Sequence, residues 1–122
     1  MKQTLILDFD GVIHSYQSGW KGAAVIPDPP TDGAREAIAK LRERYVVVVV
    51  SSRCHQDGGI DAIWEWLRKH RIEVDGVTND KPPHICTVDD RAFRFEGDWQ
   101  AVIDSVEAAS VPWNKKGLTA QP

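Results

Sequence analysis

Four aspartates carry most of the chemistry that this sequence suggests. Asp8 and Asp10 stand two positions apart after a short apolar run, and Asp89 and Asp90 follow another such run. Carboxylates that share a small volume repel one another, and a divalent cation removes that cost. Since a donor set of oxygens without histidine or cysteine suits Mg²⁺ better than zinc, the four aspartates are predicted to form a magnesium site.

Ser51 and Lys81 are the residues expected to bind a phosphate beside that cation. They supply a hydroxyl donor and a fixed positive charge, and backbone N–H groups in the turns after strands can add further donors. One carboxylate of the Asp8-x-Asp10 pair can attack phosphorus while the other handles a proton, because residues two apart in an extended strand share a face. Phosphoryl transfer is therefore the predicted chemistry.

Four more residues are expected to contact the substrate. Ser52 adds a second hydroxyl at the same strand end. Arg53 and Arg91 directly follow residues of the predicted site and could face the substrate, or else form salt bridges to the acid cluster or to a nearby helix. His14 lies in an irregular segment that would form a flap over the site. Aromatic residues of that segment, such as Trp20, could stack on a base or sugar, or pack the flap onto the domain.

The elements that must position these groups alternate between strand and helix. Apolar runs rich in β-branched residues predict strands at 5–7, 45–50, 72–77 and 84–88, with a very short edge strand at 93–95. Apolar residues at i, i+3, i+4 and i+7 predict helices at 34–41, 57–70 and 98–109. The same spacing places Trp64 and Trp99 in the core and leaves Trp66 off the apolar face, as an interface candidate.

This alternation predicts an α/β fold of the three-layer, Rossmann-like kind, with a mainly parallel sheet of four to five strands flanked by helices. In such sheets, ligands bind outside the carboxyl ends of the strands, where the polar residues named above would meet. The run at 45–50 shows no alternation, so both faces of that strand are expected to be covered. Residues 1–110 are expected to form the domain and 111–122 a loose tail.

Composition sets wide limits on function. The 122 residues suit one domain, and no apolar run approaches the roughly 20 residues that a membrane span needs. A signal peptide is not visible, so the expected location is the cytoplasm, and two cysteines are too few for a disulfide scaffold. The net charge is −3, which neither supports nor excludes a polyanionic substrate once the four site aspartates are set aside.

Four short motifs, in this order, resemble those of the haloacid dehalogenase superfamily of phosphatases. They are Asp8-Phe9-Asp10-Gly11-Val12, then Ser51, then Lys81-Pro82, then Asp89-Asp90, each at a predicted strand end or loop within about residues 5–91. The resemblance implies that Asp8 is the nucleophile and Asp10 the general acid and then the base. It also implies that Mg²⁺ is held by Asp8, the carbonyl of Asp10 and Asp90, with Asp89 in support.

The same resemblance implies that Ser51 and Lys81 grip the phosphoryl oxygens. Val12 departs from the family pattern, because many phosphate-specific members have Thr at that position. The intervals between the motifs are too short for a cap domain, so the site is expected to be open and to suit a large phosphorylated substrate. Asp89-Asp90-Arg91 also resembles the phosphatase domain of phage-type polynucleotide kinase-phosphatases, so a nucleotide or a 3′-phosphate nucleic-acid end is a candidate substrate.

Two other classes compete with this interpretation. A phosphoacceptor receiver domain has a similar length and a similar set of acids, but its lysine follows the acceptor aspartate, whereas Lys81 precedes the last acids. The second alternative is a non-catalytic phosphate- or nucleotide-binding module that keeps the fold with a degenerate site. Loss of metal-dependent turnover with retained ligand binding would favour that module.

Overall fold

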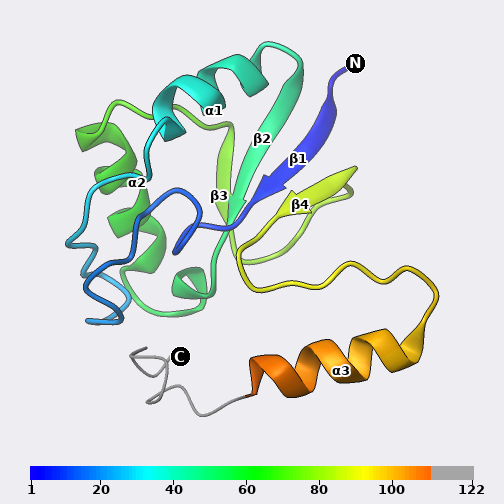
Figure 1. The fold of residues 1–122 in the computed structure, drawn as a ribbon. Coiled ribbons are helices and arrows are strands. Elements are labelled where there is room, and N and C mark those ends of the chain that lie inside the picture. Colours follow the sequence, from blue (N-terminus) through cyan, green and yellow to red (C-terminus); the bar gives the residue numbers. More distant parts are fainter. Residues whose placement is uncertain (111–122) are drawn as a thin grey trace. The chain divides into compact units, whose positions relative to one another are not determined.

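The computed structural model describes residues 1–110, and the predicted tail 111–122 lies outside the described residues. The chain forms two compact units, 1–90 and 91–122, each considered by itself. In the first unit the elements are β1 (Gln3–Leu7), α1 (Ala34–Arg42), β2 (Tyr45–Val50), a 3₁₀ turn (Ser52–His55), α2 (Gly59–Lys69), β3 (Gly76–Thr78) and β4 (Cys86–Val88) (Figure 1). The second unit contains α3 (Trp99–Ala109).

All four strands of the sheet are parallel, in the order β3-β2-β1-β4 (Figure 1). The register places Leu7 of β1 opposite Val49 of β2 and opposite Val88 of β4. The residues that follow β1, β2 and β4 therefore come together at one edge of the sheet, as the sequence predicted. The α/β class and the parallel sheet with flanking helices are confirmed.

One face of the sheet carries the main hydrophobic core. Alternation along the strands brings Leu5, Leu7, Val47 and Val49 to this face, where they cluster with buried residues of both α1 and α2, namely Ile38, Ile63, Trp66 and Leu67. On the opposite face, the other valines of β2 are only half-buried. The prediction of helices on both faces is therefore not met within residues 1–90, because both helices of this unit pack on the same face.

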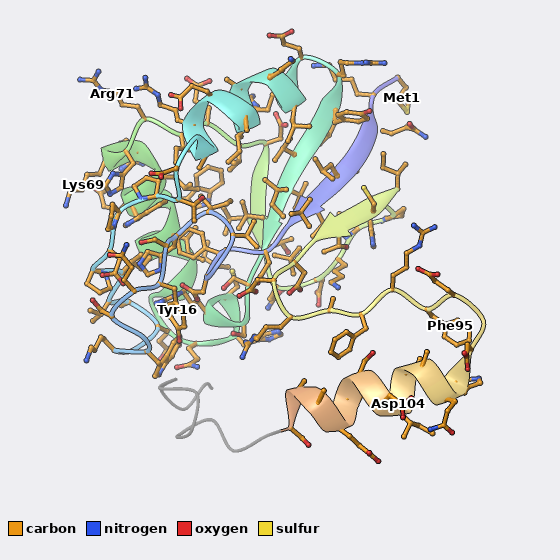
Figure 2. The ribbon with its side chains drawn as sticks, viewed as in Figure 1. Met1, Tyr16, Lys69, Arg71, Phe95 and Asp104 are labelled. Carbon is orange, nitrogen blue, oxygen red and sulfur yellow. The ribbon has the colours of Figure 1, made fainter. Side chains whose placement is uncertain are left out.

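The third strand starts later than its apolar pattern predicts. Ile72 and Val74 are buried in the core, but the backbone there closes the end of α2 instead of pairing, with the Ile72 N–H donating to Leu67 at 2.9 Å. Arg71 makes this turn with φ at 58°. Figure 2 shows the side chains of Lys69 and Arg71 pointing outward at this end of the helix. The strand predicted at 93–95 does not form.

Two tryptophans differ from their predicted environments. Trp66 is buried, and its indole N–H donates to the carbonyl of Asp28. The irregular segment that carries Asp28 therefore covers that side of α2. Trp99, expected in the core, is 69% exposed at the start of α3. Cys54 and Cys86 are free thiols, as predicted. Among the described residues, no helix has both the length and the apolar character that crossing a membrane requires.

Candidate active site

Three of the predicted site aspartates converge at the carboxyl edge of the sheet. Asp8 follows β1, and its backbone N–H donates to the carbonyl of Val88 at 2.9 Å, which continues the pairing of β1 with β4. One carboxylate oxygen from each of Asp8, Asp89 and Asp90 lies within 4.8 Å of the others. Asp8 is half-buried and the other two are exposed, so the cluster opens to solvent.

Gly11 shapes the space beside this cluster. Its φ of 86° is left-handed, and a Cβ atom at this position would lie 2.1 Å from Oδ2 of Asp90. The carboxylate of Asp90 therefore packs directly on the glycine backbone, in space that any other residue would fill. The Asp-Gly pair thus brings the first loop into contact with the strand end that carries Asp90.

Negative charge is concentrated in this cluster of three carboxylates. Burial, and then the nearby charge of Asp89, raise the pKa of Asp8 to about 7, with a further contribution from Asp90. A carboxyl with this pKa is only partly ionised near neutral pH. The three carboxylates supply hard oxygen donors without nitrogen or sulfur, which fits Mg²⁺, and a bound divalent cation would remove the repulsion among them.

Asp10 has a different environment from these three. Its carboxylate accepts hydrogen bonds from Arg53, through Nε at 2.8 Å and Nη2 at 3.0 Å, and lies 2.8 Å from Nδ1 of His14. Burial alone would raise the pKa of Asp10, but the hydrogen bonds from His14 and Arg53 and the charge of Arg53 outweigh it and lower the pKa. The Asp10 side chain is thus tied to Arg53 and His14 instead of joining the three-carboxylate cluster.

Arg53 and His14 are completely buried, although both were expected to contact substrate. Nη1 of Arg53 donates to the carbonyls of Gly22, Ala23 and Val25, at 2.9, 2.9 and 3.1 Å. Neither side chain has surface left for a ligand, so the structure corrects that expectation. Both instead contact Asp10 from the interior.

Ser51 ends β2, the strand adjacent to β1, and its side chain is buried. Its hydroxyl oxygen accepts the backbone N–H of Arg53 at 3.2 Å, which caps the 3₁₀ turn and leaves the hydroxyl proton able to donate elsewhere. Cβ at Gly59 would lie 1.8 Å from the Arg53 carbonyl oxygen, so a glycine is required where α2 meets this turn. Ser52, the alternative hydroxyl, is exposed.

The geometry of the three carboxylates does not test the roles predicted for Lys81 and Arg91. Lys81 is exposed in the loop between β3 and β4, and no hydrogen bond or ion pair in the described part of the chain joins it to the three carboxylates. Arg91 is the first residue of the second unit. The roles predicted for these two residues therefore stay predictions.

Asp28 was missed by the sequence interpretation. Its backbone N–H donates to Nε2 of His14 at 3.1 Å, and its carboxylate accepts both the N–H and the hydroxyl of Ser18. Asp28 lies far along the chain from the site motifs, in a segment without regular structure. No local sequence pattern marks a residue of this kind.

Comparisons of the chain with protein-family models, with curated proteins and with solved structures find no significant match. The assignment of a function to this site therefore depends on its own residues and geometry.

Proposed function

We propose that this protein is a Mg²⁺-dependent phosphohydrolase of the haloacid dehalogenase kind, which acts through an aspartyl phosphate. The observation that carries the proposal is the convergence of Asp8, Asp89 and Asp90 within 4.8 Å, at the edge where Ser51 ends the adjacent strand. A carboxylate nucleophile, an oxygen-only cation site and a hydroxyl donor at one sheet edge suit phosphoryl transfer.

In the first half-reaction, a carboxylate oxygen of Asp8 forms a bond to phosphorus while the bond from phosphorus to the leaving oxygen breaks. The leaving oxygen takes a proton from the protonated form of Asp10, which is the minor form because Arg53 and His14 favour the carboxylate, so the alcohol leaves neutral. In the second half-reaction, water attacks the phosphorus of the aspartyl phosphate, Asp10 takes the proton from water, and the Asp8 carboxylate is restored as phosphate leaves. Mg²⁺ held by Asp8, Asp89 and Asp90 would supply charge neutralisation for the phosphoryl group.

The proposed substrate is a phosphate monoester on a large or extended molecule. Asp89 and Asp90 are exposed. The described segments between Asp10 and Ser51, and between Ser51 and Lys81, hold loops, a 3₁₀ turn, two α-helices and two strands but no separate cap. An open site accepts a phosphate at the end of a large molecule, such as a 3′-phosphate nucleic-acid end or a nucleotide. Ser51, and Lys81 as predicted, would bind the phosphoryl oxygens.

Hydrolysis of p-nitrophenyl phosphate tests the proposal, with Mg²⁺ or EDTA, for the wild type and for Asp8→Asn. We expect turnover that requires Mg²⁺ and falls by about 10³-fold or more in the variant. A panel of nucleotides and 3′-phosphorylated oligonucleotides then defines the substrate. Turnover that survives in Asp8→Asn would reject the nucleophile, whereas Mg²⁺-dependent binding of beryllium fluoride without any turnover on the panel would indicate a binding module.

A further inference from the structure

The imidazole of His14 bridges Asp10, in the candidate site, and Asp28, which has no role in the proposed reaction. Nδ1 lies 2.8 Å from Oδ1 of Asp10, and Nε2 accepts the backbone N–H of Asp28 at 3.1 Å. The ring is completely buried between these two partners. Nε2 also lies 3.6 Å from Oδ2 of Asp28, beyond hydrogen-bond distance, so its hydrogen-bond partner is the backbone N–H, whereas the partner of Nδ1 is a carboxylate.

This pair of contacts selects one form of the histidine. A backbone N–H can only donate, so Nε2 must be unprotonated to accept from Asp28. The single proton of the neutral ring is then on Nδ1, where it donates to Asp10. The contacts thus favour the Nδ1–H tautomer of His14, with Nε2 as the acceptor of the Asp28 backbone N–H.

The ring and its donor are themselves held in place. Phe9 stacks on His14 with ring centroids 5.6 Å apart, and Trp66 meets it edge-on at 5.6 Å. Asp28 is fixed by Ser18, which donates two hydrogen bonds to its carboxylate, and by Trp66, which donates to its carbonyl. The position of the Nδ1–H donor is therefore set by packing on both faces of the ring.

We propose that His14 is a positioning residue for Asp10: held in its Nδ1–H form by the backbone of Asp28, it fixes the carboxylate of Asp10 in the orientation needed for proton transfer. Arg53 holds the same carboxylate from a second direction through Nε and Nη2. Two donors from different directions restrict rotation of a carboxylate more than either one alone. This inference rests on the proposed function, in which Asp10 is the group that moves the proton.

The tautomer gives a test that needs no activity. Long-range ¹H–¹⁵N correlation spectra of the ¹⁵N-labelled protein should show a histidine with a protonated Nδ1 and an unprotonated Nε2 that is assigned to His14 by its loss in His14→Asn. This loss distinguishes it from His84, whose Nδ1 lies 2.7 Å from the carbonyl oxygen of Pro82. In Asp10→Asn the Nδ1 proton resonance of His14 should shift, because its acceptor has changed. A His14 ring protonated on Nε2, or an Nδ1 proton that does not respond to Asp10→Asn, would overturn the inference.

Two variants then separate positioning from general stability. The side-chain amide of His14→Asn puts an N–H donor where Nδ1 stands, whereas that of His14→Gln puts its polar end nearer to Nε2 and leaves Asp10 without this donor. We expect kcat for p-nitrophenyl phosphate to fall at least about tenfold in His14→Gln, with KM changed less than about twofold, and to be largely restored in His14→Asn.

Ile38→Val is the matched control, because it removes a buried methyl group from α1 and leaves the hydrogen bonds of His14 and Asp10 unchanged. It should lower the Tm without lowering kcat. If kcat falls in proportion to Tm in all three variants, His14 has only a structural role. A wild-type protein without turnover would reject the proposed function, and the spectra of His14 would still decide whether Asp28 sets its tautomer and Asp10 accepts its proton.

Discussion

The backbone N–H of Asp8 donates to the carbonyl of Val88 at 2.9 Å, and this bond determines where the candidate site forms. It extends the β1–β4 ladder by one residue beyond Leu7, so the end of β1 cannot separate from the end of β4. Asp8 is thereby held close to Asp89 and Asp90, the residues that follow Val88. A stable backbone pairing thus enforces an unfavourable proximity of three carboxylates, which is the arrangement expected of a site built for a cation.

The first prediction concerns the free energy of unfolding of the metal-free protein, in which the three carboxylates repel one another. The pKa of Asp8 is raised to about 7 in the folded state, so ionising it costs more in the native than in the unfolded chain. The folded state retains this proton over a range where the unfolded chain loses it, so stability should fall as pH rises from about 4 to about 7. In EDTA at pH 8, Asp8→Asn should therefore be more stable than the wild type by about 1–2 kcal/mol, because solvent screens part of the repulsion at the half-exposed Asp8.

Urea denaturation of both proteins at pH 4 and pH 8 checks this expectation. The difference in unfolding free energy between Asp8→Asn and the wild type should be close to zero at pH 4, where Asp8 is protonated in the native state. Asp80→Asn, which changes an exposed loop carboxylate outside the cluster, is the matched control and should show no such gain. A variant Asp8→Asn that is less stable than the wild type at pH 8 would contradict the repulsion argument.

The second prediction is that Mg²⁺ stabilises the protein more at high pH than at low pH. A cation binds the ionised carboxylates, and protons compete with it wherever Asp8 is protonated. Thermal scans in 10-fold steps of Mg²⁺ concentration should therefore show a larger rise in Tm at pH 8 than at pH 5, and the rise should be abolished in Asp90→Ala. An equal rise at both pH values would mean that the ion binds elsewhere on the chain.

The third prediction addresses the side chain of Arg53. Its guanidinium donates to both carboxylate oxygens of Asp10 and to three loop carbonyls, and it is completely buried with its Cζ 4.8 Å from the ring centroid of Trp20. A lysine keeps the charge but cannot make a forked contact and cannot reach all these acceptors. Arg53→Lys should therefore lose about 2–4 kcal/mol of unfolding free energy, since it leaves buried acceptors unsatisfied.

Chemical denaturation measures this loss. Arg68→Lys, at an exposed arginine that pairs with Glu65 on the surface of α2, is the control, and it should change stability by less than about 0.5 kcal/mol. A loss in Arg53→Lys as small as in this control would show that the buried network contributes little.

The sequence predicted the strands and helices best where apolar periodicity is strong, as for β2, α1 and α2. It failed where a distant segment decides the environment of a residue. Trp66 was predicted to lie off the apolar face of α2, but it joins the core, where it packs edge-on against Phe9 and its indole N–H donates to the carbonyl of Asp28. In the same way, His14 and Arg53 are polar residues typical of a surface, and only the three-dimensional contact with Asp10 explains their burial.

Within the site, three of the four predicted carboxylates lie together, whereas their roles in metal binding and catalysis stay predictions. The convergence of Asp8 with Asp89 and Asp90 follows from parallel pairing alone, because register brings residues at the ends of neighbouring strands together. Lys81 lies in a loop, where no regular geometry fixes the direction of a side chain, so its place could not be predicted in the same way. Apolar periodicity shows that a helix is amphipathic but not which face of the sheet it covers, and within residues 1–90 both helices pack on the same face.

The fourth prediction uses the close contact between Gly11 and Asp90. Gly11→Ala would put a Cβ atom 2.1 Å from Oδ2 of Asp90, so the carboxylate must move away from the position it shares with Asp8. Gly33 is a matched control, because its φ of 80° is as left-handed as that of Gly11, at 86°, while a Cβ there meets nothing within 4 Å. Both variants should lose about 1 kcal/mol of stability from backbone strain. Only Gly11→Ala should also weaken Mg²⁺ binding, by about tenfold or more in a calorimetric titration, because it displaces one of three ligands. Equal Mg²⁺ affinity in the two variants would show that Asp90 can leave the cluster without consequence, and the cation would then depend on Asp8 and Asp89 alone.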